Sequence, residues 1–282
     1  MISFDIFQTV GPKDKKIIQH TNKVNGENVI GFDNMYHLSE SNDIKLNNSE
    51  AVDASFFPFT YDYVKEKMIK KNRAGWVYAQ LVKLYYPQIQ NNKDYVLVID
   101  SDVFFTKKLN FFDENNKPFF TTSNEYHEAY FSHMLRVHPS LTRESKESGI
   151  SHHMIFNKHI LTSLFNMVEN DSGKKFYDVY LEKIDSSEES PSADYEIYFH
   201  YVLKNFKNEY SIRKLHWANT SRLSLKKFAK YEMLSLPHYS NSRPEDLFQN
   251  IKNKKFNRMF NSFLNFFFLN FIVNYYQKNL NS

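Results

Sequence analysis

The chain has 282 residues, of which 41% are hydrophobic and 17% aromatic, so it can bury the core of one large domain. Its formal net charge of +4 is too small to indicate nucleic-acid binding, and no arginine-rich arm accompanies that charge. The sequence contains no cysteine, which excludes disulfides and cysteine-ligated zinc or iron–sulfur sites within it.

The first residues, MISFDIFQTVGPKDKK, predict a strand, a tight loop and then a helix for which Asp14 is a suitable N-cap. No basic segment precedes an apolar run there, so we expect no signal peptide and a cytoplasmic protein. The stretch NVIGF at 28–32 predicts a second short strand. Helical spacing follows over 58–72, and GWVYAQLVKLYYP at 75–87 predicts an amphipathic helix that ends before Pro87.

The run DYVLVI at 94–99 is apolar on both faces, which is typical of a central, parallel strand. Strands that alternate with helices predict an α/β domain, in which ligands bind at the carboxyl ends of the strands. Asp100 and Asp102 come directly after this strand, with Ser101 between them. Two close carboxylates repel each other, and Mg²⁺ or Mn²⁺, which bind carboxylates together with substrate phosphates, removes that cost. The alternative is an exposed turn that only caps the strand.

Two further regions offer ligand-binding side chains. The loop after the first strand is expected to hold a nucleotide base, through Thr9, Val10 and Lys13. The helix at 75–87 has two interpretations. In the first it is a core helix with Leu81 and Leu84 buried and Lys83 solvated. In the second its first turns lie beside a ligand, which they contact through Arg73, Trp76 and Gln80.

The segment DSSEESPSADYEIYFHYVLKNF predicts a serine-rich loop and then a helix with Ser192 as its N-cap. Asp194 and Glu196 fall in the first turn of that helix. Acidic residues are favourable there because they complement the helix dipole, which needs no chemistry. A carboxylate can also act as a general base that takes a proton from a hydroxyl group. HMIF at 153–156 predicts a short strand, and His152 and His153 cannot both face the same side of an extended chain.

Five stretches resemble, in their order, those of DUF6492-type proteins: GWVYAQLVKL, YVLVIDSDVFF, SGISHHMIFNK, SADYEIYFHYV and EMLSLPHYS. Such proteins resemble nucleotide-sugar glycosyltransferases of the GT-A fold. The resemblance implies a GT-A domain over 1–244, with a Rossmann-like mixed sheet flanked by helices. It is followed at 245–282 by a basic and aromatic helical tail.

The resemblance also implies an activity: metal-dependent transfer of a sugar from a nucleotide-sugar such as a UDP-hexose. The acceptor would be a glycan or a lipid-linked molecule in surface polysaccharide synthesis, and the transfer would be inverting. Asp102 would bind Mn²⁺ or Mg²⁺ directly, and Asp100 would contact the metal through water or hold the donor. His238, or less favourably His216, would be a further metal ligand. Asp194 would be the base, and Glu196 its partner or a contact of the acceptor. The other implied contacts involve donor residues Thr9, Val10, Lys13, Arg73, Trp76, Gln80, Asp100 and Ser101, and sugar or acceptor residues His152 and His153.

A second class of function stays open: an α/β protein that binds nucleotide or phosphate without glycosyl transfer, such as a nucleotidyltransferase-like or phosphohydrolase-like protein. Phosphohydrolases generally use further carboxylates near the first, and the next one here is Asp113. The tail combines the basic IKNKKFNR with MFNSFLNFFFLNFIVNYY, which is interrupted by asparagines. Three interpretations of the tail compete: contact with the inner face of a membrane through 252–276, a final core helix, or an oligomer contact.

Overall fold

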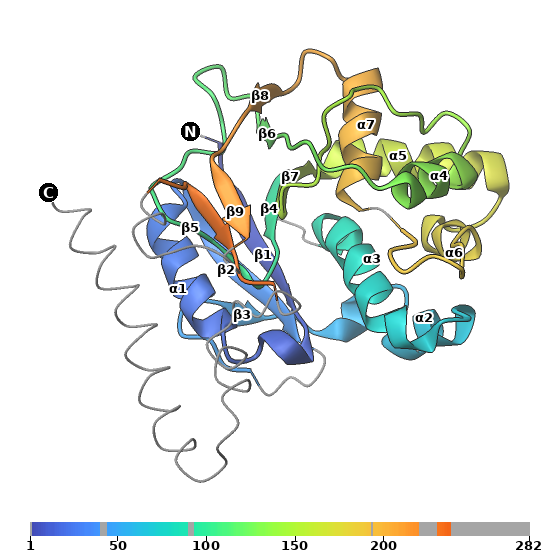
Figure 1. The fold of residues 1–282 in the computed structure, drawn as a ribbon, viewed down its shortest axis with the longest axis horizontal. Coiled ribbons are helices and arrows are strands. Elements are labelled where there is room, and N and C mark those ends of the chain that lie inside the picture. Colours follow the sequence, from blue (N-terminus) through green and yellow to red (C-terminus); the bar gives the residue numbers. More distant parts are fainter. Residues whose placement is uncertain (1, 40–43, 90–92, 193, 220–229, 238–282) are drawn as a thin grey trace, which may run out of the picture. The chain divides into compact units, whose positions relative to one another are not determined.

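The computed structural model describes residues 2–39, 44–89, 93–192, 194–219 and 230–237 (Figure 1). They fall into two compact units. The first contains the amino-terminal residues through Gly11, together with Gly31–Asp100 and Phe111–Lys214. The second contains Pro12–Ile30, Ser101–Asn110 and the described residues from Leu215 onward. The chain therefore crosses between the units several times, and each is described by itself.

The first unit is built on a five-stranded mixed sheet with the order β3-β2-β1-β4-β7. β1 (Phe4–Val10) pairs in parallel with β2 (Phe32–Ser39) and with β4 (Tyr95–Ile99). β3 (Glu50–Ala51) extends the parallel part, and β7 (His153–Asn157) runs antiparallel to β4. Both β1 and β4 are inner strands, so the predicted central strand is confirmed, with an antiparallel neighbour on one side.

Helices flank this sheet and pack through aromatic side chains. They are α2 (Tyr61–Lys67), α3 (Ala74–Ile89), α4 (Glu128–Val137), α5 (Lys158–Ser172), α6 (Phe176–Glu182) and α7 (Tyr195–Asn205). Tyr86 of α3 stacks on Phe7 of β1 with ring centroids 3.8 Å apart, and Tyr85 stacks on Phe165 of α5 at 4.6 Å. The Tyr198 hydroxyl of α7 accepts from the Asn157 backbone N–H at 2.8 Å. The high aromatic content thus forms the core between helices and sheet.

Short elements complete the first unit. Two of them are the 3₁₀ turns η2 (Ala54–Phe56) and η3 (Lys71–Arg73), the latter leading directly into α3. β6 (Phe119–Thr121) pairs in parallel with β8 (Ser211–Arg213). A further 3₁₀ turn, η1 (Pro12–Asp14), belongs to the second unit.

The second unit packs α1 (Ile18–Asn28) against a three-stranded sheet with the order β5-β10-β9. These strands are β5 (Val103–Phe105), β9 (Trp217–Asn219) and β10 (Met233–Ser235). The side chains of Asn25 and Asn28 donate to backbone carbonyls of β5 at 2.9 and 2.7 Å. These amides satisfy strand carbonyls that would otherwise be buried without a partner.

Several local predictions are confirmed and others are wrong. Strands were correctly predicted at β1, β4 and β7. The strand expected at NVIGF is wrong, because the strand begins only at Phe32. The helix expected to end before Pro87 runs on to Ile89 with that proline inside it. Pro87 has no N–H to donate to the carbonyl four residues before it, and the helix continues for only two residues beyond this proline.

Both predicted N-caps are also wrong. The N-cap of α1 is Ile17, which makes no side-chain capping bond, and Asp14 ends η1 instead. The N-cap of α7 is Asp194, whose side chain accepts from the Tyr195 N–H, so Ser192 lies outside the helix. Aspartate is one of the residues preferred at a helix N-cap, so the cap of α7 moves by two residues to an equally suitable side chain.

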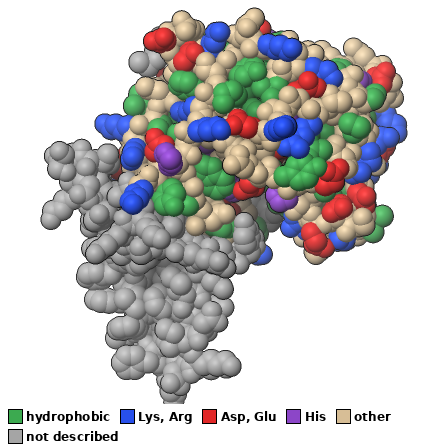
Figure 2. Space-filling model, turned by 45° about the horizontal axis from the view of Figure 1, so that its top comes forward, with side chains coloured by type: hydrophobic (Ala, Val, Ile, Leu, Met, Phe, Trp, Pro, Cys, Tyr) green, Lys and Arg blue, Asp and Glu red, His purple; other side chains and the backbone are tan. Residues whose placement is uncertain are grey.

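Within the described ranges, no helix is long and apolar enough to cross a membrane. The tail predicted at 245–282, including the possible membrane contact at 252–276, lies outside those ranges. On the face shown in Figure 2, acidic, basic and apolar side chains are interspersed, in keeping with the small net charge.

Candidate functional site

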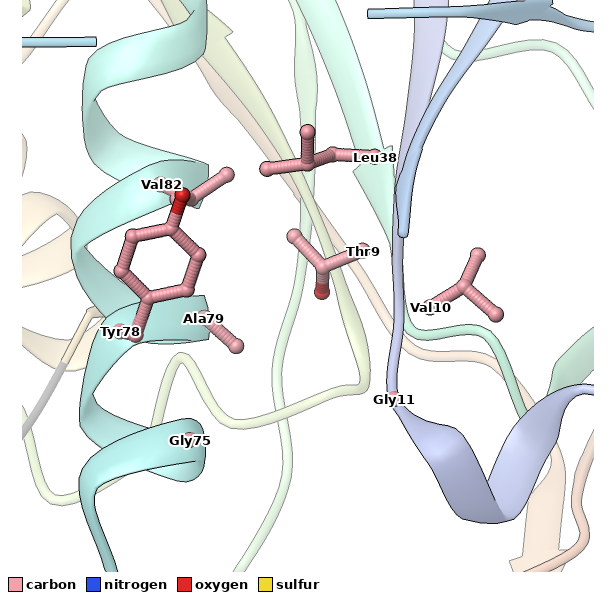
Figure 3. Close-up of a pocket in the computed structure, with 8 residues that line it drawn as sticks. All are labelled: Thr9, Val10, Gly11, Leu38, Gly75, Tyr78, Ala79 and Val82. Atoms are coloured by element: carbon pink, nitrogen blue, oxygen red, sulfur yellow. The ribbon is translucent and has the colours of Figure 1, made fainter. Parts of the chain in front are cut away.

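A pocket lies beside α3 at the carboxyl ends of β1 and β2. It opens to solvent, contains about 300 Å³ of space, and is lined by Thr9, Val10, Gly11, Leu38, Gly75, Tyr78, Ala79 and Val82. Figure 3 shows Tyr78 and Val82 of α3 on one side and Thr9 and Leu38 of the two strands opposite them. Thr9 and Val10, two residues predicted to hold a nucleotide base, therefore line a pocket where α/β sheets bind ligands.

α3 presents a second, polar face that does not line this pocket. Trp76, Gln80 and Lys83 are spaced four and three residues apart, so they share one side of the helix. Gln80 and Lys83 are both buried. The expectation that Lys83 is solvated is therefore wrong. A lysine is buried in this way only when its charge is compensated by nearby groups.

Three side chains compensate the Lys83 ammonium. Lys83 Nζ donates to Asp100 Oδ1 at 2.7 Å and lies 3.1 Å from Asp194 Oδ2. It also lies 4.6 Å from the centroid of the Tyr195 ring, within the range of a cation–π contact. One ammonium thus joins the end of β4, which precedes Asp100, to the start of α7.

Both carboxylates of this network have further partners. The Tyr195 hydroxyl donates to Asp100 Oδ1 at 2.9 Å, and His152 Nδ1 lies 3.3 Å from Asp100 Oδ2. Asp194 Oδ1 accepts from the Tyr195 backbone N–H at 2.6 Å. With its amide nitrogen turned toward Asp194, Gln80 donates to both carboxylate oxygens, at 2.8 and 2.6 Å. The five side chains of Gln80, Lys83, Asp100, Asp194 and Tyr195 form one connected network, called here the Lys83 network.

The pKa values of the two carboxylates in the Lys83 network are shifted in opposite directions. Burial alone would raise the pKa of Asp100, but the Lys83 ammonium and the His152 hydrogen bond hold it below its ordinary value. Burial raises the pKa of Asp194 above its ordinary value, against the attraction of Lys83, and the charge on Asp100 adds to the rise. The Lys83 pKa is raised well above its ordinary value, because the pull of both carboxylates outweighs the effect of burial. Lys83 therefore stays charged.

The two neighbouring histidines occupy different environments, as the sequence predicts. The His152 backbone is left-handed, with φ of 60°, and its carbonyl accepts from the Asp100 N–H at 3.0 Å. His153 is buried, with Nδ1 2.7 Å from the Ser151 carbonyl and Nε2 3.0 Å from Thr121 Oγ1. Burial lowers the pKa of His153 to about 3, so it is neutral. His152 is thus the member of the pair that contacts the Lys83 network.

Glu196 lies in a separate buried group. Its carboxylate accepts from the Ser148 hydroxyl and from the Gly149 N–H at 3.0 Å, and His200 Nε2 lies 3.2 Å away. These contacts hold the loop before β7 against α7. A role for Glu196 as partner of the base stays a prediction, and its burial at 1% exposure favours a structural role.

Arg73 and Trp76 stand at the amino-terminal end of α3, outside the residues that line the pocket. The Arg73 guanidinium lies 4.7 Å from the centroid of the Trp76 ring. Trp76 in turn stacks on Tyr130 of α4 with ring centroids 6.3 Å apart. Their predicted donor contacts stay predictions.

The remaining predicted residues belong to the second unit. Lys13 is exposed in η1, and Ser101 is buried, with its hydroxyl donating to Asp14 at 2.5 Å. Asp102 is half-buried, and its carbonyl accepts from the Leu236 N–H, just after β10, at 2.8 Å. His216 is exposed before β9. His238 comes two positions after Leu236 and lies outside the described residues.

Among the residues that the structure describes, no group of three His, Asp or Glu side chains could hold a metal ion. Mg²⁺ and Mn²⁺ need fewer protein ligands than this, because they typically use one or two carboxylates with substrate phosphates. Asp102 offers such a carboxylate. The oxygens of Asp100 already contact Lys83, Tyr195 and His152, which fits an indirect role better than direct ligation.

Lys83 and Tyr195 were missed as site residues when the sequence alone was considered. The signal that could have revealed Lys83 is its surroundings, LVKLYY, in which it is the one charged residue among apolar neighbours. A lysine in the apolar part of a helix predicts burial and a carboxylate partner. The signal for Tyr195 is weaker, because nothing near it in the sequence indicates that its hydroxyl reaches Asp100.

The crystal structure of mouse xyloside xylosyltransferase 1 in its apo form is similar at a TM-score of 0.45 and 8% identity, covering 85% of this chain and 99% of that chain. A likeness this weak carries no conclusion about activity. No curated protein matches the sequence. A protein family described as a family of unknown function, DUF6492, matches residues 32–240. Because this match spans most of the sequence, the chain belongs to the DUF6492 family.

Proposed function

We propose that the chain is a metal-dependent glycosyltransferase that moves a sugar from a nucleoside diphosphate to a hydroxyl acceptor. The observation that carries the proposal is the Lys83 network, which fixes Asp100 at the carboxyl end of β4. The same unit contains a pocket at the carboxyl ends of β1 and β2. Open α/β sheets bind nucleotides at this edge, and a carboxylate held there, two residues before Asp102 in the sequence, suits a donor with a bound cation.

The pocket suits the nucleobase of the donor. Its walls are mostly apolar, with the ring of Tyr78 and the side chains of Leu38 and Val82, while Thr9 supplies a hydroxyl. Gly75 and Ala79 line the α3 side of the pocket, and their small side chains leave space for a ligand there. The pocket is small and open to solvent, which suits one planar base rather than a whole nucleotide-sugar.

The chemistry requires charge neutralisation at the leaving group. Transfer releases a nucleoside diphosphate, and a divalent cation stabilises its developing negative charge. We assign Mn²⁺ or Mg²⁺ to Asp102, with His238 as the favoured further ligand and His216 as the alternative. The donor is proposed to be a UDP-hexose and the acceptor a glycan or lipid-linked molecule of surface polysaccharide synthesis. Inversion with Asp194 as base stays a prediction, because this carboxylate is buried and held by several donors.

Calorimetry tests the proposal. The wild-type chain should bind UDP in the presence of Mn²⁺ and lose this binding when the metal is chelated. Asp102→Ala should abolish the metal-dependent binding while it leaves the fold intact, since the side chain is half-buried in a turn. Preference for a nucleoside triphosphate over UDP, or hydrolysis without sugar transfer, would favour the nucleotidyltransferase-like or phosphohydrolase-like alternative.

A second experiment tests the pocket. Ala79→Leu adds bulk to the α3 wall of the pocket and should weaken UDP binding. The matched control is Ala129→Leu, which makes the same substitution at a partly buried position on α4, away from the residues that line the pocket. Equal UDP affinities of the two variants would place the base elsewhere.

A further inference from the structure

We infer that Lys83 is a positioning residue, which fixes the Asp100 carboxylate for the donor and does not bind the donor itself. The inference rests on the proposed function and assigns a role to a residue that the sequence left as a solvated surface lysine. It is carried by three observations: the partners of the ammonium, the gradient of exposure across the Lys83 network, and the way in which Asp194 is anchored.

The Lys83 ammonium has a partner on every accessible side. Its hydrogens can be directed to Asp100 at 2.7 Å, to Asp194 at 3.1 Å and toward the ring of Tyr195 at 4.6 Å. An ammonium has three N–H donors, so these partners use its full capacity. Its side chain is 6% exposed. A lysine that binds a diphosphate instead needs an ammonium open to the ligand.

Exposure rises through the network toward Asp100. The side chain of Asp100 is 24% exposed, against 6% for Lys83 and 8% for Asp194. Asp100 is therefore the member that a ligand can reach, and the other two lie behind it. The ammonium holds Asp100 Oδ1 on its inner side, which leaves the carboxylate little freedom to rotate.

Asp194 anchors the lysine in turn. It accepts from the Tyr195 backbone N–H at the start of α7 and from the amide of Gln80, one turn before Lys83 on α3. The chain of contacts runs from α7 and α3 through Asp194 to Lys83 and ends at Asp100. A network whose members are all satisfied is rigid, and a rigid supporting shell is what holds a ligand-contacting group in place.

The alternative role for Lys83, purely structural stabilisation, makes a different prediction. A buried ion pair is often no more stabilising than apolar residues of the same volume. If the lysine had only this structural role, replacing it would change stability but would not change ligand binding through Asp100. A positioning role requires that the effect of Lys83 on ligand binding vanish once Asp100 can no longer act.

The experiment is a double-mutant cycle on the affinity for UDP with Mn²⁺, using Lys83→Met, Asp100→Asn and the double variant. Each single variant is expected to weaken binding by about tenfold or more, the equivalent of 1.4 kcal/mol. The double variant should bind no worse than Asp100→Asn alone. Lys174→Met is the matched control, because this lysine also pairs with a carboxylate, Glu182, but on the surface. It should bind as the wild type does.

Two results would overturn the inference. If Lys83→Met binds as tightly as the wild type, the lysine does not position Asp100. If the double variant loses a further factor of about ten relative to Asp100→Asn, Lys83 contacts the donor independently. Should Lys83→Met not fold, Asp194→Asn removes the anchor while it leaves Lys83 paired with Asp100. It should weaken UDP binding several-fold, and unchanged affinity would equally contradict the inference.

If the proposed function is wrong, the experiment gives a different result. In that case the wild-type chain itself does not bind UDP with Mn²⁺. The link between Lys83 and Asp100 then remains testable by urea unfolding of the same four proteins. Non-additive losses of unfolding free energy support the link, and additive losses contradict it.

Discussion

Replacing Lys83 by methionine should destabilise the fold far more than loss of a surface lysine. The substitution keeps much of the side-chain volume but removes the one ammonium that contacts Asp100 and Asp194. Without the ammonium that both contact, the two carboxylates repel each other. Breaking a buried pair by removal of one partner typically costs about 3–5 kcal/mol. We therefore expect a loss of about 3–5 kcal/mol in the free energy of unfolding at pH 7, measured by urea unfolding.

The pH dependence of this loss has a definite sign. In the wild type the pKa of Asp100 is lowered, so its contribution to stability is present above its unfolded value and disappears as the pH falls through the folded value. Without Lys83, burial raises the pKa of both carboxylates, so folding binds protons and the variant loses stability as the pH rises above about 4. The difference between the two proteins should therefore be larger at pH 7 than at pH 4.5. A loss below about 1 kcal/mol at pH 7, typical of an exposed pair, would refute the reasoning.

Three other parts of the molecule allow further predictions. Gly149→Ala should cost about 1–3 kcal/mol in urea unfolding, because its Cβ would meet Cβ and Cγ of Phe199 at 2.6 and 2.7 Å; an unchanged midpoint would contradict the packing there. Mn²⁺ should bind weakly alone and much more tightly with UDP, as seen by calorimetric titration, because Asp102 is the one carboxylate assigned to it; strong binding without UDP would indicate a preformed site. A chain that stops after Asn250 should stay soluble and bind nucleotide, while the full chain sediments with anionic vesicles through 252–276; unfolding or aggregation of the short form would favour a core helix.

The inner strands and the place of the acidic pair could be predicted because the necessary information is local. A run such as YVLVI is buried wherever it forms a strand, and the polar residues at its carboxyl end must lie at a sheet edge. The partner of Asp100 could not be found in this way. Lys83 is separated from Asp194 by most of the first unit in sequence, and only the packing of α3 against the rest of that unit brings the two together. The same applies to Tyr195, whose hydroxyl reaches Asp100 only in the folded chain.

Helix ends were predicted less well than strands, for a physical reason. Ser192, Asp194 and Glu196 are all acceptable near a helix start, so propensity alone does not choose among them. The choice falls on Asp194 because its carboxylate is also needed by Lys83 and Gln80. Tertiary contacts thus decide a question that looks local in the sequence.

The two aspartates after β4 have different proposed roles, although only one residue separates them. The simplest account of such a pair is that a cation offsets the repulsion of both carboxylates. In this chain the charge of Asp100 is already offset by Lys83, a cation that the protein supplies itself. The repulsion therefore gives Asp100 no reason to bind a metal directly. The case for a metal at Asp102 depends instead on the phosphates of a donor, which carry negative charge. Lys83 does not neutralise that charge, because its ammonium is already paired with Asp100 and Asp194.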